Sequence, residues 1–182
     1  MCTELLNGCY RVVEIIDDDY VIKRPAAIYD DNGYVVDKTP CLDCCSFPEE
    51  CLMCNINELK IYREFGADFS CLCPIDLDLS TKNEVYMRKV DITAADILYC
   101  RCSSKTESLI SSNIGYSNDL VKTLAALIDQ EWIDICGAIE FMRQVERLDD
   151  QIEYFSDDLH AGNIGVLNNM PVIIDYGLTE VY

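Results

Sequence analysis

Three oxygen-bearing side chains near the end of the chain, Asp158, Asn163 and Asp175, stand at spacings that suit a metal and phosphate site. Two apolar runs, 163–167 and 171–175, predict the strands of a tight hairpin. Because the strands of a hairpin run antiparallel, we expect Asn163 and Asp175, at its open end, to meet. Amide and carboxylate oxygens are ligands that Mg²⁺ accepts while it keeps substrate phosphates. The pattern therefore predicts a site for Mg²⁺ and phosphate.

The segment from Asp158 to Gly177 resembles a part of the protein-kinase-like phosphotransferases. Asp158-Leu-His-Ala-Gly-Asn163, followed by Asp175-Tyr-Gly177, is similar to their catalytic loop and metal-binding triplet, and most of all to the aminoglycoside-phosphotransferase and atypical-kinase branch. The resemblance implies that Asp158 is the base or orienter for the accepting hydroxyl, and that Asn163 and Asp175 hold Mg²⁺ on ATP. It leaves two roles open for His160, a contact with the transferred phosphate or packing of the loop.

The N-terminal half offers the other residues that the resemblance implies. A turn at Gly8 would cover the phosphates, and Lys23 on a third strand would reach them. A glutamate on the next helix would hold that lysine. Glu58 and Glu64 are both available, and we select Glu58 because it shares a helix face with the apolar residues of that helix.

The chain departs from the family pattern in three respects. The phosphate turn has one glycine, Gly8, and Ser156-Asp157 stands where the family has His-Arg. The sequence ends at Tyr182, five residues after Gly177, so the resemblance covers the N-lobe and the first part of the C-lobe. We expect a C-lobe without the usual substrate platform. Other parts of the chain or a partner replace it, or the site binds nucleotide and transfers nothing.

A cysteine-rich stretch at 40–54 permits two interpretations. Two Cys-x-x-Cys pairs there supply four thiols with the ligand count of a tetrahedral Zn²⁺ site: Cys41, Cys44, Cys51 and Cys54. The other interpretation is a loop of reduced thiols. Cys71 and Cys73, and likewise Cys100 and Cys102, are spaced by two, and we expect them in the core.

Hydrophobic periodicity and turn residues predict an α+β fold in which strands and helices are segregated. Strands fill the first forty residues, a helix starts at an N-cap Asn55 and stops at Gly66, and a second strand pair covers 75–79 and 85–90. A polar loop at 103–118 precedes a helical stretch, 119–148, with a break near 130–134. We therefore expect a reduced kinase-like fold: an antiparallel N-lobe with one helix at 1–91, including the insertion at 40–54, a polar loop or insertion at 92–118, and a minimal, mostly helical C-lobe at 119–182.

Charge and composition limit the partners. The 182 residues carry 14 basic and 33 acidic side chains, a net charge of −19. Such a surface repels nucleic acid and anionic membranes, so we expect neither as a direct ligand and favour a basic-surfaced protein partner.

No signal pattern or long apolar run is present, which predicts a cytoplasmic protein, in the host cytoplasm if it is viral. Small size, acidity and the trimmed enzyme pattern are similar in style to bacteriophage proteins, and the oligomeric state stays open.

Two functions follow from these features. The first is an ATP- and Mg²⁺-dependent phosphotransferase of minimal kinase-like fold that acts on a protein. The alternative is a kinase-derived acidic binding protein, a pseudokinase or nucleic-acid mimic, that inhibits a basic-surfaced host partner. A third, a zinc-stabilised acidic adaptor, needs the cysteine site alone.

Overall fold

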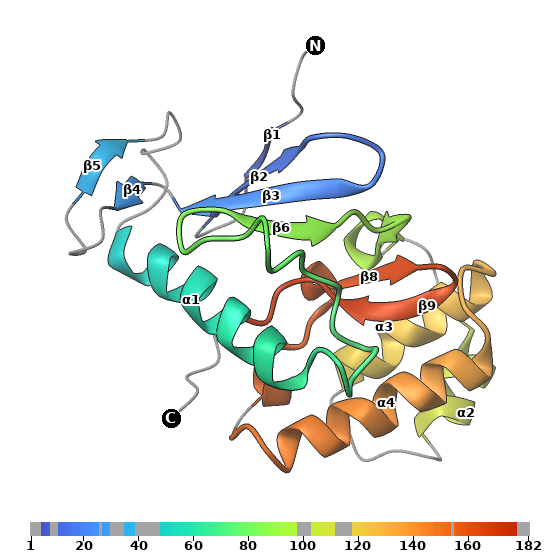
Figure 1. Cartoon of the computed structure of the whole chain (residues 1–182). Helices are drawn as coiled ribbons and strands as arrows, with labels where there is room; N and C mark the ends of the chain where they lie inside the picture. Colours follow the sequence, from blue (N-terminus) through green and yellow to red (C-terminus); the bar gives the residue numbers. More distant parts are fainter. Residues whose placement is uncertain are drawn as a thin grey trace.

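The computed structural model describes residues 5–7, 11–25, 27–29, 35–38, 48–97, 103–111, 118–153 and 155–177. Together these ranges form an α+β fold with an antiparallel N-terminal sheet, one long helix beside it and a mostly helical second half (Figure 1). The fold class expected from the sequence is confirmed. Within the described ranges, no helix is both long and apolar enough to cross a membrane.

The N-terminal sheet is a four-stranded antiparallel sheet in the order β1-β2-β3-β6. Its strands are β1 (Leu5–Asn7), β2 (Arg11–Ile15), β3 (Tyr20–Pro25) and β6 (Val85–Arg88). The turn between β2 and β3 forms because the Asp17 carboxylate accepts the backbone amides of Asp19 and Tyr20, both at 2.8 Å. A separate two-stranded hairpin consists of β4 (Ala27–Tyr29) and β5 (Val35–Lys38).

Helix α1 (Pro48–Phe65) begins seven residues before the expected N-cap, so the prediction of an N-terminus at Asn55 is wrong. A proline at the first helical position and acidic residues in the first turn favour this earlier start. Asn55 lies inside the helix and is buried. The predicted cysteine-rich loop at 40–54 is therefore helical from Pro48 on.

The segment after α1 corrects the predicted second strand pair. Only Ile75 pairs with Met87 of β6, as an isolated bridge, and 75–79 is no strand. The Asp76 carboxylate accepts the amides of Asp78 and Leu79, each at 3.1 Å, and bends this stretch into a turn.

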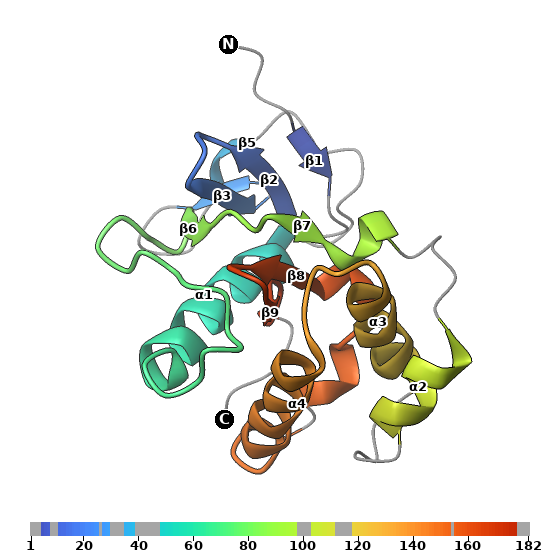
Figure 2. The ribbon, with the colours of Figure 1, turned by 90° about the vertical axis from the view of Figure 1, so that its right-hand side faces the viewer.

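The second half contains a small sheet and several helices. The sheet has the order β7-β8-β9, with β7 (Ile92–Thr93), β8 (Ile164–Leu167) and β9 (Met170–Ile173). The helices are α2 (Ser104–Ser111), α3 (Asn118–Asp129) and α4 (Ile135–Asp149), with 3-10 turns η1 (Ala94–Ile97), η2 (Phe155–Asp158) and η3 (Ala161–Asn163). Figure 2 shows α2, α3 and α4 on one side of the β8–β9 hairpin and the N-terminal sheet on the other.

Two predictions about this half are tested by these elements. The break near 130–134 is confirmed, because α3 ends at Asp129 and Asp134 caps α4. The polar loop at 103–118 is wrong in part, since α2 occupies 104–111. The Ser103 hydroxyl accepts the amide of Lys105 at 3.2 Å, and the Thr106 hydroxyl donates to Asp129 of α3 at 2.6 Å. These contacts stabilise a helix whose own sequence is polar.

The predicted hairpin is confirmed as β8–β9. Asn168 and Asn169 form its turn with φ values of 53° and 60°, the left-handed conformation that asparagine tolerates and that two-residue hairpin turns need. The amide of Cys73 donates to the Ile173 carbonyl at 3.0 Å, and the Ile173 amide donates to the Cys71 carbonyl at 2.7 Å. The segment after α1 is thus bonded directly to β9.

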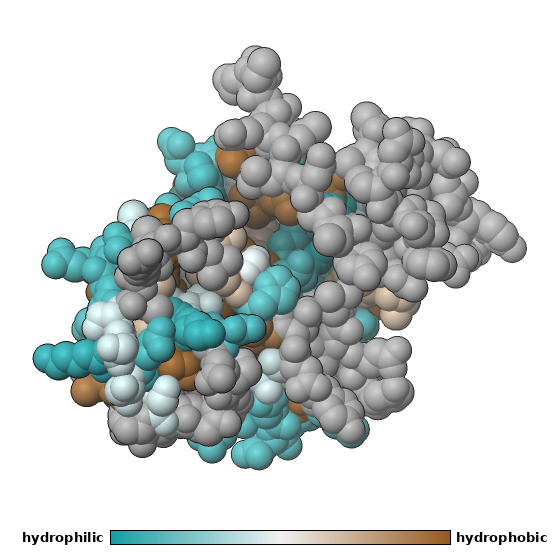
Figure 3. Space-filling model, turned by 180° about the vertical axis from the view of Figure 1, so that it is seen from behind, coloured by the Kyte–Doolittle hydropathy of each residue, from teal (hydrophilic) through white to brown (hydrophobic). Residues whose placement is uncertain are grey.

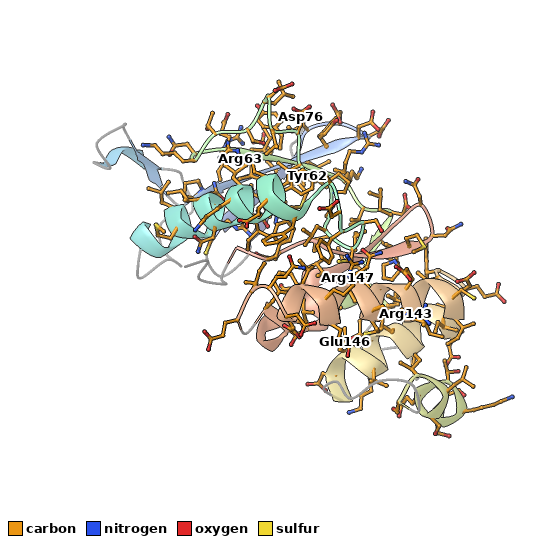
Figure 4. The ribbon with its side chains drawn as sticks, turned by 60° about the horizontal axis from the view of Figure 1, so that its bottom comes forward. Tyr62, Arg63, Asp76, Arg143, Glu146 and Arg147 are labelled. Atoms are coloured by element: carbon orange, nitrogen blue, oxygen red, sulfur yellow. The ribbon has the colours of Figure 1, made fainter. Side chains whose placement is uncertain are left out.

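One hydrophobic core joins the two halves. It includes Ile61 of α1, Met87 of β6, Phe141 of α4 and Ile164 of β8, together with the predicted core residues Cys71 and Cys73. Helix α4 also contacts the segment after α1, where the Arg147 guanidinium lies over the Phe69 ring, 4.9 Å from its centre. Figure 4 shows Arg147 on α4 with Tyr62 and Arg63 at the end of α1 across from it.

The described surface shows no single large apolar patch on the face seen in Figure 3, where hydrophobic residues appear in separate spots among hydrophilic ones. Among the described residues, the large hydrophobic side chains that are exposed are spread along the chain: Ile16, Met53, Leu79, Leu109 and Met170. Scattered exposure of this kind is normal for a folded protein.

Candidate functional site

The structure brings together Lys23 and Glu58, the pair that the resemblance implies. Lys23 extends from β3 and Glu58 from α1, and the Lys23 ammonium lies 2.8 Å from Glu58 Oε1. Both side chains are buried, with Lys23 5% and Glu58 0% exposed. Charged groups are buried only when they are paired, so this ion pair fixes the position of α1 relative to the sheet.

Asp175 lies just after β9, next to this pair. Asn163 directly precedes β8 and Asp175 follows β9 by two residues, and the Ile174 amide donates to the Asn163 carbonyl at 2.8 Å at this open end of the hairpin. Lys23 also donates to the Ile174 carbonyl. The strand end that carries Asp175 is therefore held against the Lys23–Glu58 pair.

Arg11 is a fourth charged residue of the site, and the sequence reasoning missed it. Its guanidinium donates to Glu58 Oε2 at 2.6 Å, to Asn55 Oδ1 at 3.2 Å, and to the Asp175 carboxylate. A signal for it existed in the register of the β2–β3 hairpin. Val13 stands opposite Lys23, so Arg11, two residues before Val13, projects on the same face as Lys23.

The charges of this network shift the pKa values of its members. Burial would raise the pKa of Asp175, but the positive charges of Arg11 and Lys23 and the Gly177 amide outweigh it and lower that pKa. Burial alone would lower the pKa of Arg11, and the carboxylates of Glu58 and Asp175 instead raise it. The Asp175 carboxylate is thus ionised at neutral pH, as a metal ligand must be.

The residues after Asp175 are packed on α1. Tyr176 is buried, its hydroxyl donates to the Cys73 carbonyl at 3.1 Å, and its amide donates to Glu58 Oε1 at 3.4 Å. Burial raises the pKa of the Tyr176 hydroxyl well above its usual value. A Cβ at Gly177 would lie 2.1 Å from the Cys54 carbonyl oxygen, so the close approach to α1 requires glycine at this position. Asn57 donates to the Gly177 carbonyl at 3.2 Å.

The loop that precedes the hairpin is braced by α4 and by its own turns. The Ser156 amide donates to the Asp149 carboxylate of α4 at 2.7 Å, and η2 then ends at Asp158. The side chain of Asp158 lies outside the described residues. His160 is exposed and its Nδ1 accepts the Gly162 amide at 3.0 Å, which caps η3. Asn163, at the start of the hairpin, is buried, with 7% of the residue exposed.

Three other predicted site residues fall outside the described part of the chain: Gly8, Cys41 and Cys44. Cys51 lies in α1, but its side chain is not described. Cys54 is buried in α1, and burial raises the pKa of its thiol to about 11. No group of three or more histidine, cysteine or acidic side chains with metal-binding geometry occurs among the described residues. The zinc site stays a prediction.

The chain was compared with known proteins. No protein-family model and no curated protein matches it. Among solved structures, the ternary complex of streptomycin, ATP and APH(2")-IIa matches with 16% sequence identity and a TM-score of 0.45, over 100% of this chain and 67% of that one. At this identity and score the match is a likeness only.

Proposed function

We propose that the chain is an ATP- and Mg²⁺-dependent phosphotransferase of minimal kinase-like fold that acts on a protein. The observation that carries this proposal is the buried Lys23–Glu58 ion pair, 2.8 Å long, against the strand end that bears Asp175. A lysine held by a glutamate on one side of a site, with an acidic residue after a hairpin on the other, is the arrangement that kinase-type phosphoryl transfer uses.

The residues fit a magnesium ion by the chemistry of their donors. Asp175 offers a carboxylate and Asn163 an amide oxygen at the open end of one hairpin, and both are ligands that Mg²⁺ accepts. When bound, the ion would neutralise charge on the phosphates of ATP. We assign Asn163 and Asp175 to holding it.

The other site residues act on the nucleotide or the acceptor. Lys23 presents its ammonium toward phosphates from a rigid strand, and Glu58 keeps that ammonium in place. Asp158 is assigned to the accepting hydroxyl, as base or orienter. His160 caps η3 through the Gly162 amide and so shapes the loop between Asp158 and Asn163. Gly8 belongs to the turn assigned to the phosphates.

The acceptor that we propose is a basic-surfaced protein. The net charge of −19 favours such a partner electrostatically and disfavours nucleic acid. The test is incubation of the purified chain with radiolabelled ATP, Mg²⁺ and a series of basic proteins or a cell lysate. We expect label on the chain or on a protein, and loss of at least 99% of it with Asp158→Ala. Label transfer that survives Asp158→Ala would contradict the assigned role.

One observation favours the alternative function, a kinase-derived protein that binds and inhibits a basic-surfaced host partner. The Arg11 guanidinium already occupies the Asp175 carboxylate, in the place that a metal ion would take in a catalytic site. This function predicts tight association that weakens steeply with added salt and survives Asp175→Ala. Affinity that is unchanged between low and high salt would exclude it. A bacteriophage origin, if found, would suit this alternative best.

A further inference from the structure

Arg11 makes a contact that affects how the proposed metal site is filled. Its guanidinium bonds the Asp175 carboxylate, which is the group assigned to Mg²⁺ above. The same guanidinium bonds the fully buried Glu58, at 2.6 Å to Oε2 and 3.3 Å to Oε1. Arg11 therefore connects the glutamate of the ion pair with the proposed metal ligand.

The charges of these four residues balance without a metal ion. Arg11 and Lys23 bring two positive charges, and Glu58 and Asp175 bring two negative ones. A divalent cation on Asp175 would lie beside the guanidinium, and like charges at such close range repel strongly in a partly buried site. Arg11 and a metal ion on this carboxylate therefore disfavour each other.

The network is built so that Arg11 can release Asp175 and stay bound. Asp175 is 37% exposed, whereas the side chain of Glu58 is 0% exposed. After release, Arg11 keeps its bonds to Glu58 and to the Asn55 amide oxygen at 3.2 Å. Glu58 would then still hold both of its cations, Arg11 and Lys23. Asp175 is the exposed partner of Arg11, so a metal ion would replace the guanidinium there and not at Glu58.

From this geometry we propose that Arg11 and a divalent metal ion compete for Asp175, so that Arg11 sets the metal affinity of the site. The inference rests on the proposed function, because it takes Asp175 as the metal ligand. It assigns a regulatory role to a residue that neither the family motif nor the spacing of the acidic residues indicates. In the metal-free protein the guanidinium occupies the carboxylate, and metal loading requires its displacement.

The test measures binding of Mn²⁺ alone, counted as free ion by electron paramagnetic resonance, to the intact chain. Arg11→Lys keeps one positive charge but lacks the second nitrogen that lets a guanidinium bond two carboxylates. Arg11→Met removes the charge and leaves Lys23 to hold Glu58. The matched control is Arg24→Lys on β3. The Arg24 Nε bonds Glu84 Oε1 at 2.9 Å, and neither residue belongs to this network. Circular dichroism confirms that each variant is folded.

We expect both Arg11 variants to bind Mn²⁺ about tenfold more tightly than the unchanged chain, which corresponds to about 1.4 kcal/mol. Arg24→Lys should leave the affinity within a factor of two. Adding Asp175→Asn to Arg11→Lys should abolish the gain. Equal or weaker Mn²⁺ binding by the Arg11 variants, or no binding by any of the chains, would overturn the competition.

A different result would contradict the proposed function. It is contradicted if the unchanged chain gains no stability from Mg²⁺ and ATP. The competition is contradicted by the ratio of Mn²⁺ affinities between Arg11→Lys and the unchanged chain. A chain that responds to Mg²⁺ and ATP through Asp175 while Arg11→Lys binds Mn²⁺ no better would keep the function and discard the competition.

Discussion

At the scale of residues, the site is a cluster of buried charges with a shared carboxylate. Glu58 accepts bonds from Arg11, Lys23 and the Tyr176 amide, and its side chain is fully buried. Such a cluster is a poor means of gaining stability, because removing charges from water costs more than most ion pairs return. Buried charges that converge on one strand end are instead typical of functional sites.

Replacing Glu58 tests how much the fold depends on this carboxylate. Glu58→Gln keeps the shape and removes the charge that holds two cations, so both must share Asp175. Breaking a buried ion pair from one side leaves uncompensated charge, and we expect a loss of about 3 kcal/mol in the free energy of unfolding, measured by urea denaturation. The matched control is Glu64→Gln on the exposed side of the same helix, which should change stability by less than about 0.5 kcal/mol. Equal losses in the two variants would contradict the central position of Glu58.

The residues of the site were accessible to sequence reasoning to different degrees. Lys23, Glu58 and Asp175 were selected by a motif and by helix periodicity, and the structure places them together. Arg11 was missed because its partners are 47 and 164 residues away along the chain. A motif describes spacing within a short segment, whereas such contacts follow only from the tertiary fold. The strand register could have placed Arg11 beside Lys23, but not at Asp175.

At the scale of elements, the β8–β9 hairpin and helix α1 position the site. The hairpin holds Asn163 and Asp175 at its open end, and the triplet after it packs on α1 through Tyr176 and Gly177. The 71–73 segment bonds β9 from the other side. The strand end that carries Asp175 is thus fixed by neighbours on two sides, which is the preorganisation a catalytic site needs.

Helix α4 braces the loop before this hairpin, and its N-cap can be tested. The Asp134 carboxylate accepts the Gly137 amide at 2.7 Å. Asp134→Ala removes the cap, and we expect a loss of about 1 kcal/mol in the free energy of unfolding. Asp150→Ala, at the other end of α4 where only the backbone caps the helix, serves as the control and should be nearly neutral. A cost at Asp150 as large as that at Asp134 would show that the side-chain cap is not what stabilises α4.

The elements were predicted well where local signals exist. Asn168-Asn169 gives the hairpin turn, and the break between α3 and α4 was predicted from the length of the helical stretch. The predictions failed where tertiary contacts decide. Helix α2 is polar in sequence and forms against Asp129 of α3, and α1 extends back to Pro48 through cysteines that had been assigned to a loop.

At the scale of the whole molecule, one continuous core joins the N-terminal sheet to the helical half, so the two sides of the site cannot separate without disrupting it. The chain carries a net charge of −19, whereas the four charged residues of the site cancel. A ligand that brings phosphates into this field needs a cation with it. This is a physical reason to expect ATP to bind together with a divalent ion and not alone.

The most direct test of the account is the melting temperature of the chain with and without Mg²⁺ and ATP. At a ligand concentration one hundred times its dissociation constant, binding should add about 2.7 kcal/mol to the free energy of unfolding and raise the melting temperature by several degrees. We expect ATP without metal to have a much smaller effect, and Asp175→Asn to abolish the rise while remaining folded. No rise with Mg²⁺ and ATP, or an equal rise in Asp175→Asn, would contradict a nucleotide site at Asp175.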